Sequence, residues 1–200
     1  MTLRHAAILC LSGFAAAHAW GQNAREEQAV PGIRISGAQL IDQNGAKVRL
    51  PDLLKDKVAV INTVFTTCPT ICPVMGAHFA ALTRLLGDRA AREVTLISIS
   101  VDPLNDTPAR LKAWSEKFHP AQGWTLLTGD PKDIEEVLRG LRLFAIGPEN
   151  HSPSTLIGDA RKGEWRRATG LQSAEKLAAL IPSQSPPARA TATETKPDRR

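Results

Sequence analysis

Three short apolar runs, and a further segment after a turn, predict the strands of a β-sheet. VAVINTVF at 58–65 and VTLISISV at 94–101 are apolar almost without break, which is typical of strands buried on both faces. A third run, TLIG at 155–158, is followed by a turn at Gly163 and a fourth strand around 165–168. The sequence therefore predicts two central strands and a strand pair near the C-terminal end.

Apolar residues at spacings of three and four predict four helices. The first begins at Pro73 and ends at a glycine cap, Gly87. Two others begin at Thr107-Pro108 and at Asp130-Pro131, where a capping side chain precedes a proline that suits the first helical position. The fourth covers about 174–181.

The order of these elements predicts an α/β fold with a central mixed sheet and helices on both of its faces. A strand, a cysteine-containing loop and a helix follow one another from residue 58, which is the thioredoxin-like arrangement. On the N-terminal side, Asn44-Gly45 separates apolar positions in QLIDQNGAKVRL and predicts an added β-hairpin.

Composition places these elements in one globular domain. Of the 200 residues, 42% are apolar and 22% are charged, and the low aromatic content of 4% predicts a mainly aliphatic core. We interpret 1–19 as a signal peptide, 20–38 as an N-terminal linker and 39–182 as the thioredoxin-like domain. Residues 183–200 lack apolar periodicity and are rich in Pro, Ser, Thr and Ala, so they are predicted to be a disordered tail.

The first 19 residues have the features of a secretory leader. A short basic start precedes an apolar stretch from about Ala6 to Ala17, and Ala17 and Ala19 form an A-x-A cleavage pattern. The apolar stretch falls short of the roughly 20 residues that cross a bilayer. We therefore expect an exported protein, which an uncleaved leader would tether to the inner membrane.

The charge pattern excludes one class of partner and leaves another open. The formal net charge is +5, and the local basic cluster is RKGEWRR at 161–167. This cluster is either a solvated hairpin end or a docking patch for an acidic partner or a membrane surface. Nucleic acid is not expected, because aromatic and basic residues are not interleaved.

The candidate chemistry lies in FTTCPTICP at 65–73. Cys68 and Cys72 remain after removal of the leader, which contains Cys10. If Pro73 is the first helical residue, both cysteines lie at a helix N-terminus, which favours thiolate and lowers the thiol pKa. Three residues separate the cysteines, where thioredoxins have two. The wider loop could hold the sulfurs at disulfide distance or around a shared metal.

A metal needs a further ligand, and three histidines follow the leader. His78 falls inside the first helix and His119 ends the second, so both have ordinary structural explanations. His151 stands in the loop ENHSPS directly before a strand that a thioredoxin-like fold places beside the cysteine turn. Two soft thiolates and one imidazole suit copper, particularly Cu(I), whereas zinc usually takes a fourth ligand.

Three motifs in this order and spacing resemble the Sco family, also called SenC. They are FTTCPTICP, SISVDPLNDTP and NHS before a strand, within a resemblance that runs from about Gln39 to Ile181. The resemblance implies a periplasmic copper protein with a thioredoxin-like fold, in which Cys68, Cys72 and His151 bind Cu(I) or Cu(II). It matches Asp102 and Asp106 to the DPxxDT segment. We interpret Asp102 as a residue near the ligands or the docking partner, and Asp106 as support for the next helix start.

The resemblance also implies a metallochaperone, rather than an enzyme in the usual sense. It would deliver copper to the CuA site of cytochrome c oxidase subunit II, or reduce the cysteines there, and would meet a copper donor or a thiol reductant. Many members have Asp where this chain has Thr70 and Asn150. Both changes remove negative charge near the site, so another copper protein is an alternative client.

Two other functions use the same cysteines. A thiol-disulfide oxidoreductase of the thioredoxin class needs Cys68 and Cys72 but does not need His151. A structural protein would keep them as a fixed disulfide, although a bridge over so short a loop constrains little chain entropy. A peroxiredoxin is not expected, because Ile61 and Phe65 occupy the positions of its Pro and Thr.

Overall fold

The computed structural model describes residues 27–182. The predicted signal peptide and the predicted disordered tail lie outside the described residues. Within the described range, no helix is long and apolar enough to cross a membrane.

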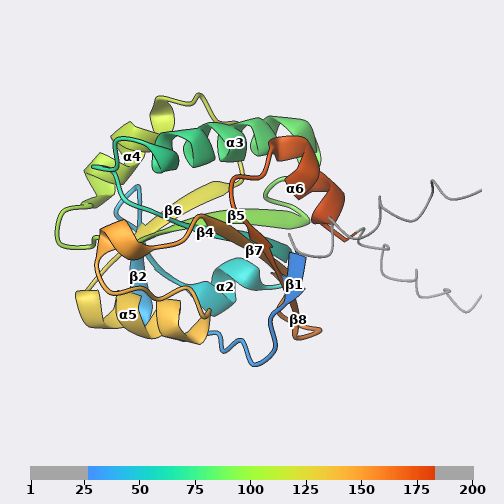
Figure 1. Cartoon of the computed structure of the whole chain (residues 1–200), viewed down its shortest axis with the longest axis horizontal. Helices are drawn as coiled ribbons and strands as arrows, with labels where there is room; N and C mark the ends of the chain where they lie inside the picture. The colour runs from blue at the N-terminus through green and yellow to red at the C-terminus, as the bar shows by residue number, and fades with distance from the viewer. Residues whose placement is uncertain (1–26, 183–200) are drawn as a thin grey trace, which may run out of the picture.

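The centre of the fold is one mixed sheet of eight strands in the order β1-β8-β7-β4-β5-β6-β2-β3 (Figure 1). The central strands β4, β5 and β6 are parallel, whereas all the other pairs are antiparallel. The strands are β1 (Glu27–Ala29), β2 (Gln39–Asp42), β3 (Lys47–Arg49), β4 (Val58–Val64), β5 (Val94–Ser100), β6 (Trp124–Thr128), β7 (Ser154–Asp159) and β8 (Glu164–Thr169).

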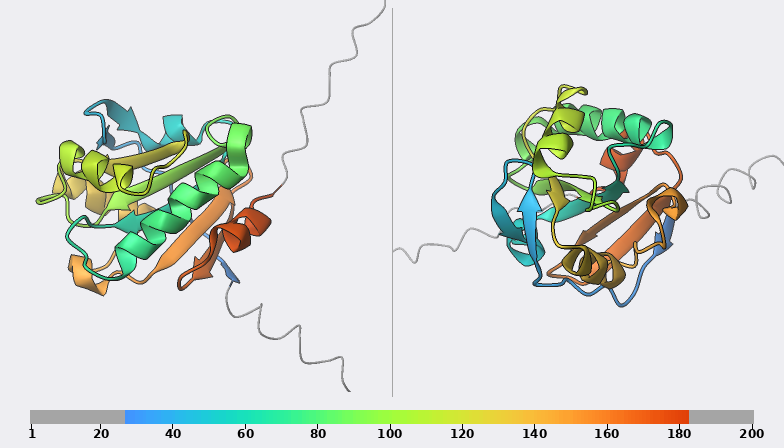
Figure 2. Two further views of the ribbon diagram at one scale, coloured as in Figure 1. Left: turned by 90° about the horizontal axis from the view of Figure 1, so that it is seen from above. Right: turned by 90° about the vertical axis from the view of Figure 1, so that its left-hand side faces the viewer.

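Helices cover both faces of this sheet. Figure 1 shows α3, α4 and α6 over one face and α2 and α5 over the other, and Figure 2 shows the twisted strands between these two layers. The helices are α2 (Leu50–Leu54), α3 (Ile71–Leu86), α4 (Pro108–Glu116), α5 (Pro131–Gly140) and α6 (Ala174–Leu180), with short 3-10 turns η1 (Gly87–Arg89) and η2 (Pro148–Asn150).

The alternation of β4 side chains divides the interior into two cores. Val60 and Val64 point to the core under α3, which also contains Phe79 and Leu177. Ile61 points to the opposite core, under α2 and α5. All seven residues of β4 are buried, because helices cover both of its faces.

The main predicted elements form, with several differences. The hairpin at Asn44-Gly45 pairs β2 with β3, and Gly87 caps α3 with a φ of 51°. Helix α3 begins at Ile71 rather than at Pro73. Pro73 is tolerated as the third helical residue because the first N–H groups of a helix have no intrahelical acceptor.

Two described strands, β1 and β6, and one described α-helix, α2, were not predicted, and neither were the two 3-10 turns. β1 lies within the segment assigned to a linker and pairs with β8, and Val30 directly after it is buried. This part of the predicted linker is therefore integrated into the fold.

Candidate metal centre

The two cysteines lie where β4 leaves the sheet and α3 begins. Val64 ends β4, and a turn in which the Cys68 N–H donates to the Phe65 carbonyl at 3.3 Å leads into the helix. Cys68 precedes α3 and Cys72 is its second residue. Both cysteines are free and buried, which fits a site that excludes bulk water.

The start of α3 directs donors at Cys68. The Cys72 N–H donates to the Cys68 Sγ at 3.5 Å, and the backbones of Thr70 and Ile71 also interact with this sulfur. Cys68 therefore receives the partial positive charge of the helix N-terminus. Cys72 lies inside the first turn and lacks that arrangement.

The two thiols consequently have opposite pKa shifts. Burial raises the pKa of the Cys68 thiol, but the N–H groups of Cys72, Thr70 and Ile71 outweigh it, so the pKa falls below its ordinary value. The pKa of the Cys72 thiol is raised to about 12, because burial, Cys68 and the charge of Asp106 together outweigh a backbone hydrogen bond at Phe65 that lowers the pKa. The prediction that the helix N-terminus lowers both pKa values is therefore wrong for Cys72.

His151 contacts the cysteine site from a distant part of the sequence. Its Nε2 lies 3.7 Å from the Cys72 Sγ, and its Nδ1 lies 3.0 Å from the Thr63 Oγ1. The ring also meets the Phe65 ring edge-on, with centroids 5.5 Å apart. The structure thus brings together Cys72 and His151, which are 79 positions apart.

The Thr63 contact is consistent with the imidazole form that binds a metal. When Nδ1 carries the proton and donates to the Thr63 hydroxyl, the Nε2 lone pair faces the sulfur of Cys72. Burial lowers the pKa of His151, which also favours the neutral ring. Because a metal ligand must be deprotonated, both effects prepare Nε2 as a donor.

The three predicted ligands form a chain of contacts with Cys72 in the middle. Cys72 interacts with the Cys68 thiol on one side and with His151 on the other. Across residues 27–182, no three or more His, Cys, Asp and Glu side chains already form a closed metal-binding group. The cysteine turn or the His151 loop must therefore adjust for all three to share one ion.

The two predicted acidic residues have different roles. The Asp102 carboxylate accepts from the Asn105 side-chain amide at 2.9 and 3.0 Å, so its described bonds remain within its own loop. Asp106 is fully buried and does not cap α4, because Thr107 is the capping residue. Our interpretation of Asp106 as support for the helix start is therefore wrong.

Asp106 instead ties the cysteine turn to β5. Its Oδ1 accepts from the Thr66 N–H at 3.0 Å and from the Thr66 hydroxyl at 2.6 Å. Its Oδ2 accepts from the Ser100 hydroxyl at 2.6 Å. Because Thr66 lies two positions before Cys68, this carboxylate fixes the path of the turn that carries the first thiol.

Sequence reasoning missed Thr63, which contacts His151. Its signal is weak but present: Thr63 is a polar residue near the end of a strand whose other positions are mostly apolar. Asp106 had a stronger signal in its DPxxDT motif, but the motif gives no direction for the side chain.

Comparison with known proteins identifies the family to which the chain belongs. The SCO1/SenC sequence profile matches residues 34–181. The chain belongs to the SCO1/SenC family. Among the relatives of this Sco-family chain, the SCO1 protein homolog of Bacillus subtilis is 37% identical over 111 residues, or 54% of this chain and 56% of the relative. The chain spans little more than half the length of the curated relatives it matches.

Solved structures agree with this assignment. ScoI of Bradyrhizobium japonicum, determined with copper bound, is 30% identical to the Sco-family chain, with a TM-score of 0.60 over 76% of this chain and 97% of ScoI. BsSco, described as a cytochrome c oxidase assembly protein of the Sco family with a disulfide switch, is 28% identical, with a TM-score of 0.61 over 74% and 91%. The fold is thioredoxin-like, as predicted.

Proposed function

We propose that this chain is an exported, periplasmic copper metallochaperone. It holds Cu(I) or Cu(II) through Cys68, Cys72 and His151. It delivers the ion to the CuA site of cytochrome c oxidase subunit II, or reduces the cysteines of that site. The observation that carries the proposal is the 3.7 Å approach of the His151 Nε2 to the Cys72 Sγ, at a dithiol turn of a Sco-family chain.

The chemistry of the donor set supports copper as the cargo. Thiolates select soft ions such as Cu(I), and an imidazole extends the range to Cu(II). The lowered pKa of Cys68 makes this sulfur the first to be available as thiolate, whereas Cys72, with a pKa of about 12, must lose its proton when it binds the ion. Copper binding should therefore release protons.

Related Sco-family structures support the direction of the proposal. Copper is bound in the Bradyrhizobium japonicum and Arabidopsis thaliana ScoI structures, and BsSco is described as an oxidase assembly protein. By extension, we propose the oxidase or another copper protein as the client. A separate copper donor or thiol reductant would reload the chain.

One departure from the usual family residues, Thr70, lies between the two cysteines, and the other, Asn150, directly precedes His151. Thr70 is exposed directly before α3. The Asn150 amide donates to the Ile146 carbonyl at 2.8 Å and to the Glu149 carboxylate at 3.1 Å. An aspartate would be unable to make these donations, so Asn150 has a structural use in the His151 loop. We propose that Asp102, in the loop that follows β5, contributes to client docking.

The first test is copper binding by the reduced protein and by His151→Ala. We expect the parent to bind one Cu(I) per chain in anaerobic competition with a calibrated chelator. Loss of one ligand should cost about 2 to 4 kcal/mol, or roughly one and a half to three decades in affinity. The disulfide between Cys68 and Cys72 should still form and be reduced, because the thiols remain.

The matched control is His119→Asn. His119 is exposed with a φ of 49°, a conformation that asparagine tolerates. This control should bind copper like the parent. Parent-like copper binding by His151→Ala, with loss of reductase activity alone, would show that the imidazole tunes a thiolate and that the chaperone assignment is wrong.

A second candidate is a thiol-disulfide oxidoreductase without copper delivery. The opposite pKa shifts of Cys68 and Cys72 favour it, because an exchange enzyme uses one available thiolate to attack and one protected thiol to resolve the mixed disulfide. Rapid exchange with a small disulfide together with an absence of stoichiometric copper binding would select this alternative.

A further inference from the structure

A cavity of about 510 Å³ adjoins the His151 loop. Thr63 lines it and also contacts the His151 imidazole. Asn150 and Ser152, the chain neighbours of His151, form another part of the wall. A ligand in this cavity would therefore contact the segments that position the predicted histidine ligand.

The wall of this cavity is cationic. Arg142 and Arg167 both contribute to it, and the described residues that line it include no Asp or Glu. Neither arginine has an ion pair within residues 27–182. The hydroxyls of Thr63 and Ser152 add further hydrogen-bonding groups. The charge and the donors together match an oxyanion.

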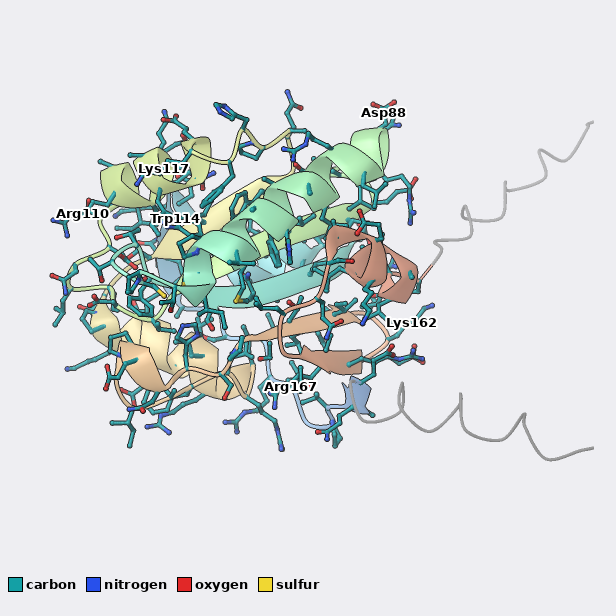
Figure 3. All side chains as sticks on the ribbon, turned by 45° about the horizontal axis from the view of Figure 1, so that its top comes forward. Asp88, Arg110, Trp114, Lys117, Lys162 and Arg167 are labelled. Atoms are coloured by element: carbon teal, nitrogen blue, oxygen red, sulfur yellow. The ribbon has the colours of Figure 1, made fainter. Side chains whose placement is uncertain are left out.

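The Arg167 guanidinium makes a hydrogen bond through its Nη2 group, whereas its Nε–H group has no partner among the described residues. Its Nη2 donates to the Arg142 carbonyl, whereas its Nε is buried and has no hydrogen-bond partner in the described part of the chain. An unsatisfied buried N–H of a guanidinium is costly and needs an explanation. Arg167, labelled in Figure 3, lies on β8 opposite Leu156, which belongs to the core under α5.

The backbone at Arg142 supports the same arrangement. Arg142 follows the end of α5 and has a φ of 56°, in the left-handed region that few non-glycine residues adopt. The Arg142 carbonyl accepts the hydrogen bond from the Arg167 guanidinium. The left-handed backbone conformation of Arg142 therefore helps to fix the position of the Arg167 side chain. Strained residues of this kind concentrate at binding sites.

We infer that this cavity binds a carboxylate side chain from an acidic segment of the protein that exchanges copper with this chain. The inference rests on the proposed function for the identity of that protein. A protein segment is favoured over a small anion by Ile146, which follows the lining residue Ala145 and is 82% exposed. If an acidic side chain of the partner enters the cavity, an apolar residue next to it in the partner's sequence can pack against Ile146.

The test uses two capped peptides, acetyl-Ala-Asp-Leu-amide and acetyl-Ala-Asn-Leu-amide. Each is titrated into the reduced, isotope-labelled protein and followed by NMR chemical shifts. The Asp peptide should shift the amides of Thr63, Asn150 and Ser152 and saturate. The Asn peptide should bind at least about tenfold more weakly, because it cannot form a charged fork with a guanidinium.

Arg167→Gln should weaken binding of the Asp peptide by about tenfold or more, and Arg142→Gln provides a second variant if the first does not fold. Arg166→Gln is the matched control, because Arg166 is the preceding residue of β8 and does not line this cavity. The control should bind the Asp peptide like the parent. Equal binding of both peptides, or parent-like binding by both cavity variants, would overturn the inference.

Two further arms separate the anion source and the proposed function. Saturating shifts from acetate without any from the Asp peptide would identify a small-anion site and overturn the protein-partner inference. Copper binding is measured separately on the parent protein. Copper binding without peptide binding contradicts only the cavity inference, whereas peptide binding without copper binding contradicts only the proposed function.

Discussion

Cys68 and Cys72 show how two adjacent thiols acquire different chemistry from one helix start. Cys68 lies before α3, where free N–H groups face its sulfur. Cys72 is itself helical and fully buried, so desolvation dominates. A single turn of helix thus separates a sulfur that favours its charged form from one that favours its neutral form.

This difference predicts unequal alkylation. Between about pH 6 and 9, Cys68 should react first with iodoacetamide, because only thiolate reacts and its pKa is the lowered one. The rate at Cys72 should rise about tenfold per pH unit over this range, since its pKa is about 12. Mass spectrometry of quenched time points measures both rates, with Cys68→Ser and Cys72→Ser as single-thiol references. Equal rates would contradict the described environments.

Asp106 supplies a second prediction at the residue scale. In Asp106→Asn, an amide NH₂ would replace an oxygen that accepts from Thr66 or Ser100, so a buried donor would lose its partner. We expect a loss of about 1 to 3 kcal/mol in the free energy of unfolding, measured with urea. Asp88→Asn is the control, because its side chain is 94% exposed and its pair with Arg92 should contribute little. Equal stability of the two variants would contradict the role assigned to Asp106.

At the scale of elements, the sequence pattern predicted the strands and turns whose conformation depends mainly on nearby residues. β4 and β5 are long, continuously apolar strands, and the hairpin at Asn44-Gly45 follows from turn chemistry, so all three were predicted. β6 was missed because WTLLT has only five residues, and its two adjacent leucines form neither a long apolar run nor a strict apolar–polar alternation. It becomes a strand through pairing with β5 and β2, and such non-local contacts have no local signature.

The candidate metal centre likewise has features that follow from sequence spacing and features that depend on non-local contacts. The spacing of Cys68 and Cys72 and the position of His151 suggested a shared site, and the structure places Cys72 in contact with both of the others. The sequence could not show that Thr63 would contact the imidazole, because that depends on the register of β4 against β7. It also could not show that Cys72 would be buried deeply enough to raise its pKa.

The contact between α3 and α4 supplies a prediction at the element scale. Gly76 faces the aromatic rings of Trp114 and Phe118, and an added Cβ would lie 2.7 Å from the first and 2.6 Å from the second. Alanine at this position gains about 1 kcal/mol in helix propensity, but overpacking against two rings should cost about 1 to 3 kcal/mol. We expect Gly76→Ala to be destabilised on balance, as measured by urea unfolding.

Gly37→Ala is the matched glycine control, because a Cβ at Gly37 would meet nothing within 4 Å. Its φ is outside the range that disfavours side chains, so it should be neutral or slightly stabilised by reduced entropy of the unfolded chain. A Gly76→Ala protein more stable than the parent would show that α4 moves away easily and does not fix the position of α3.

At the scale of the whole molecule, the site joins three separate parts of the chain. The cysteine turn follows β4, Asp106 ties that turn to the end of β5, and His151 stands before β7. β4 pairs with both β5 and β7, so the sheet brings these segments to one region. A bound ion would connect segments 79 positions apart in sequence.

This arrangement predicts that copper stabilises the whole fold. An ion that binds only the folded state at about 100 times its dissociation constant adds about 2.7 kcal/mol. For a domain of this size, that raises Tm by roughly 5 to 10 °C. Thermal unfolding of the reduced protein in chelator-buffered Cu(I) should show this rise.

At the same free Cu(I), His151→Ala should show a smaller rise, because its affinity is lower. After oxidation of Cys68 and Cys72 to a disulfide, the shift should disappear, since the thiolate ligands are gone. A copper-dependent rise that persists in the oxidised protein would place the ion away from the cysteine turn.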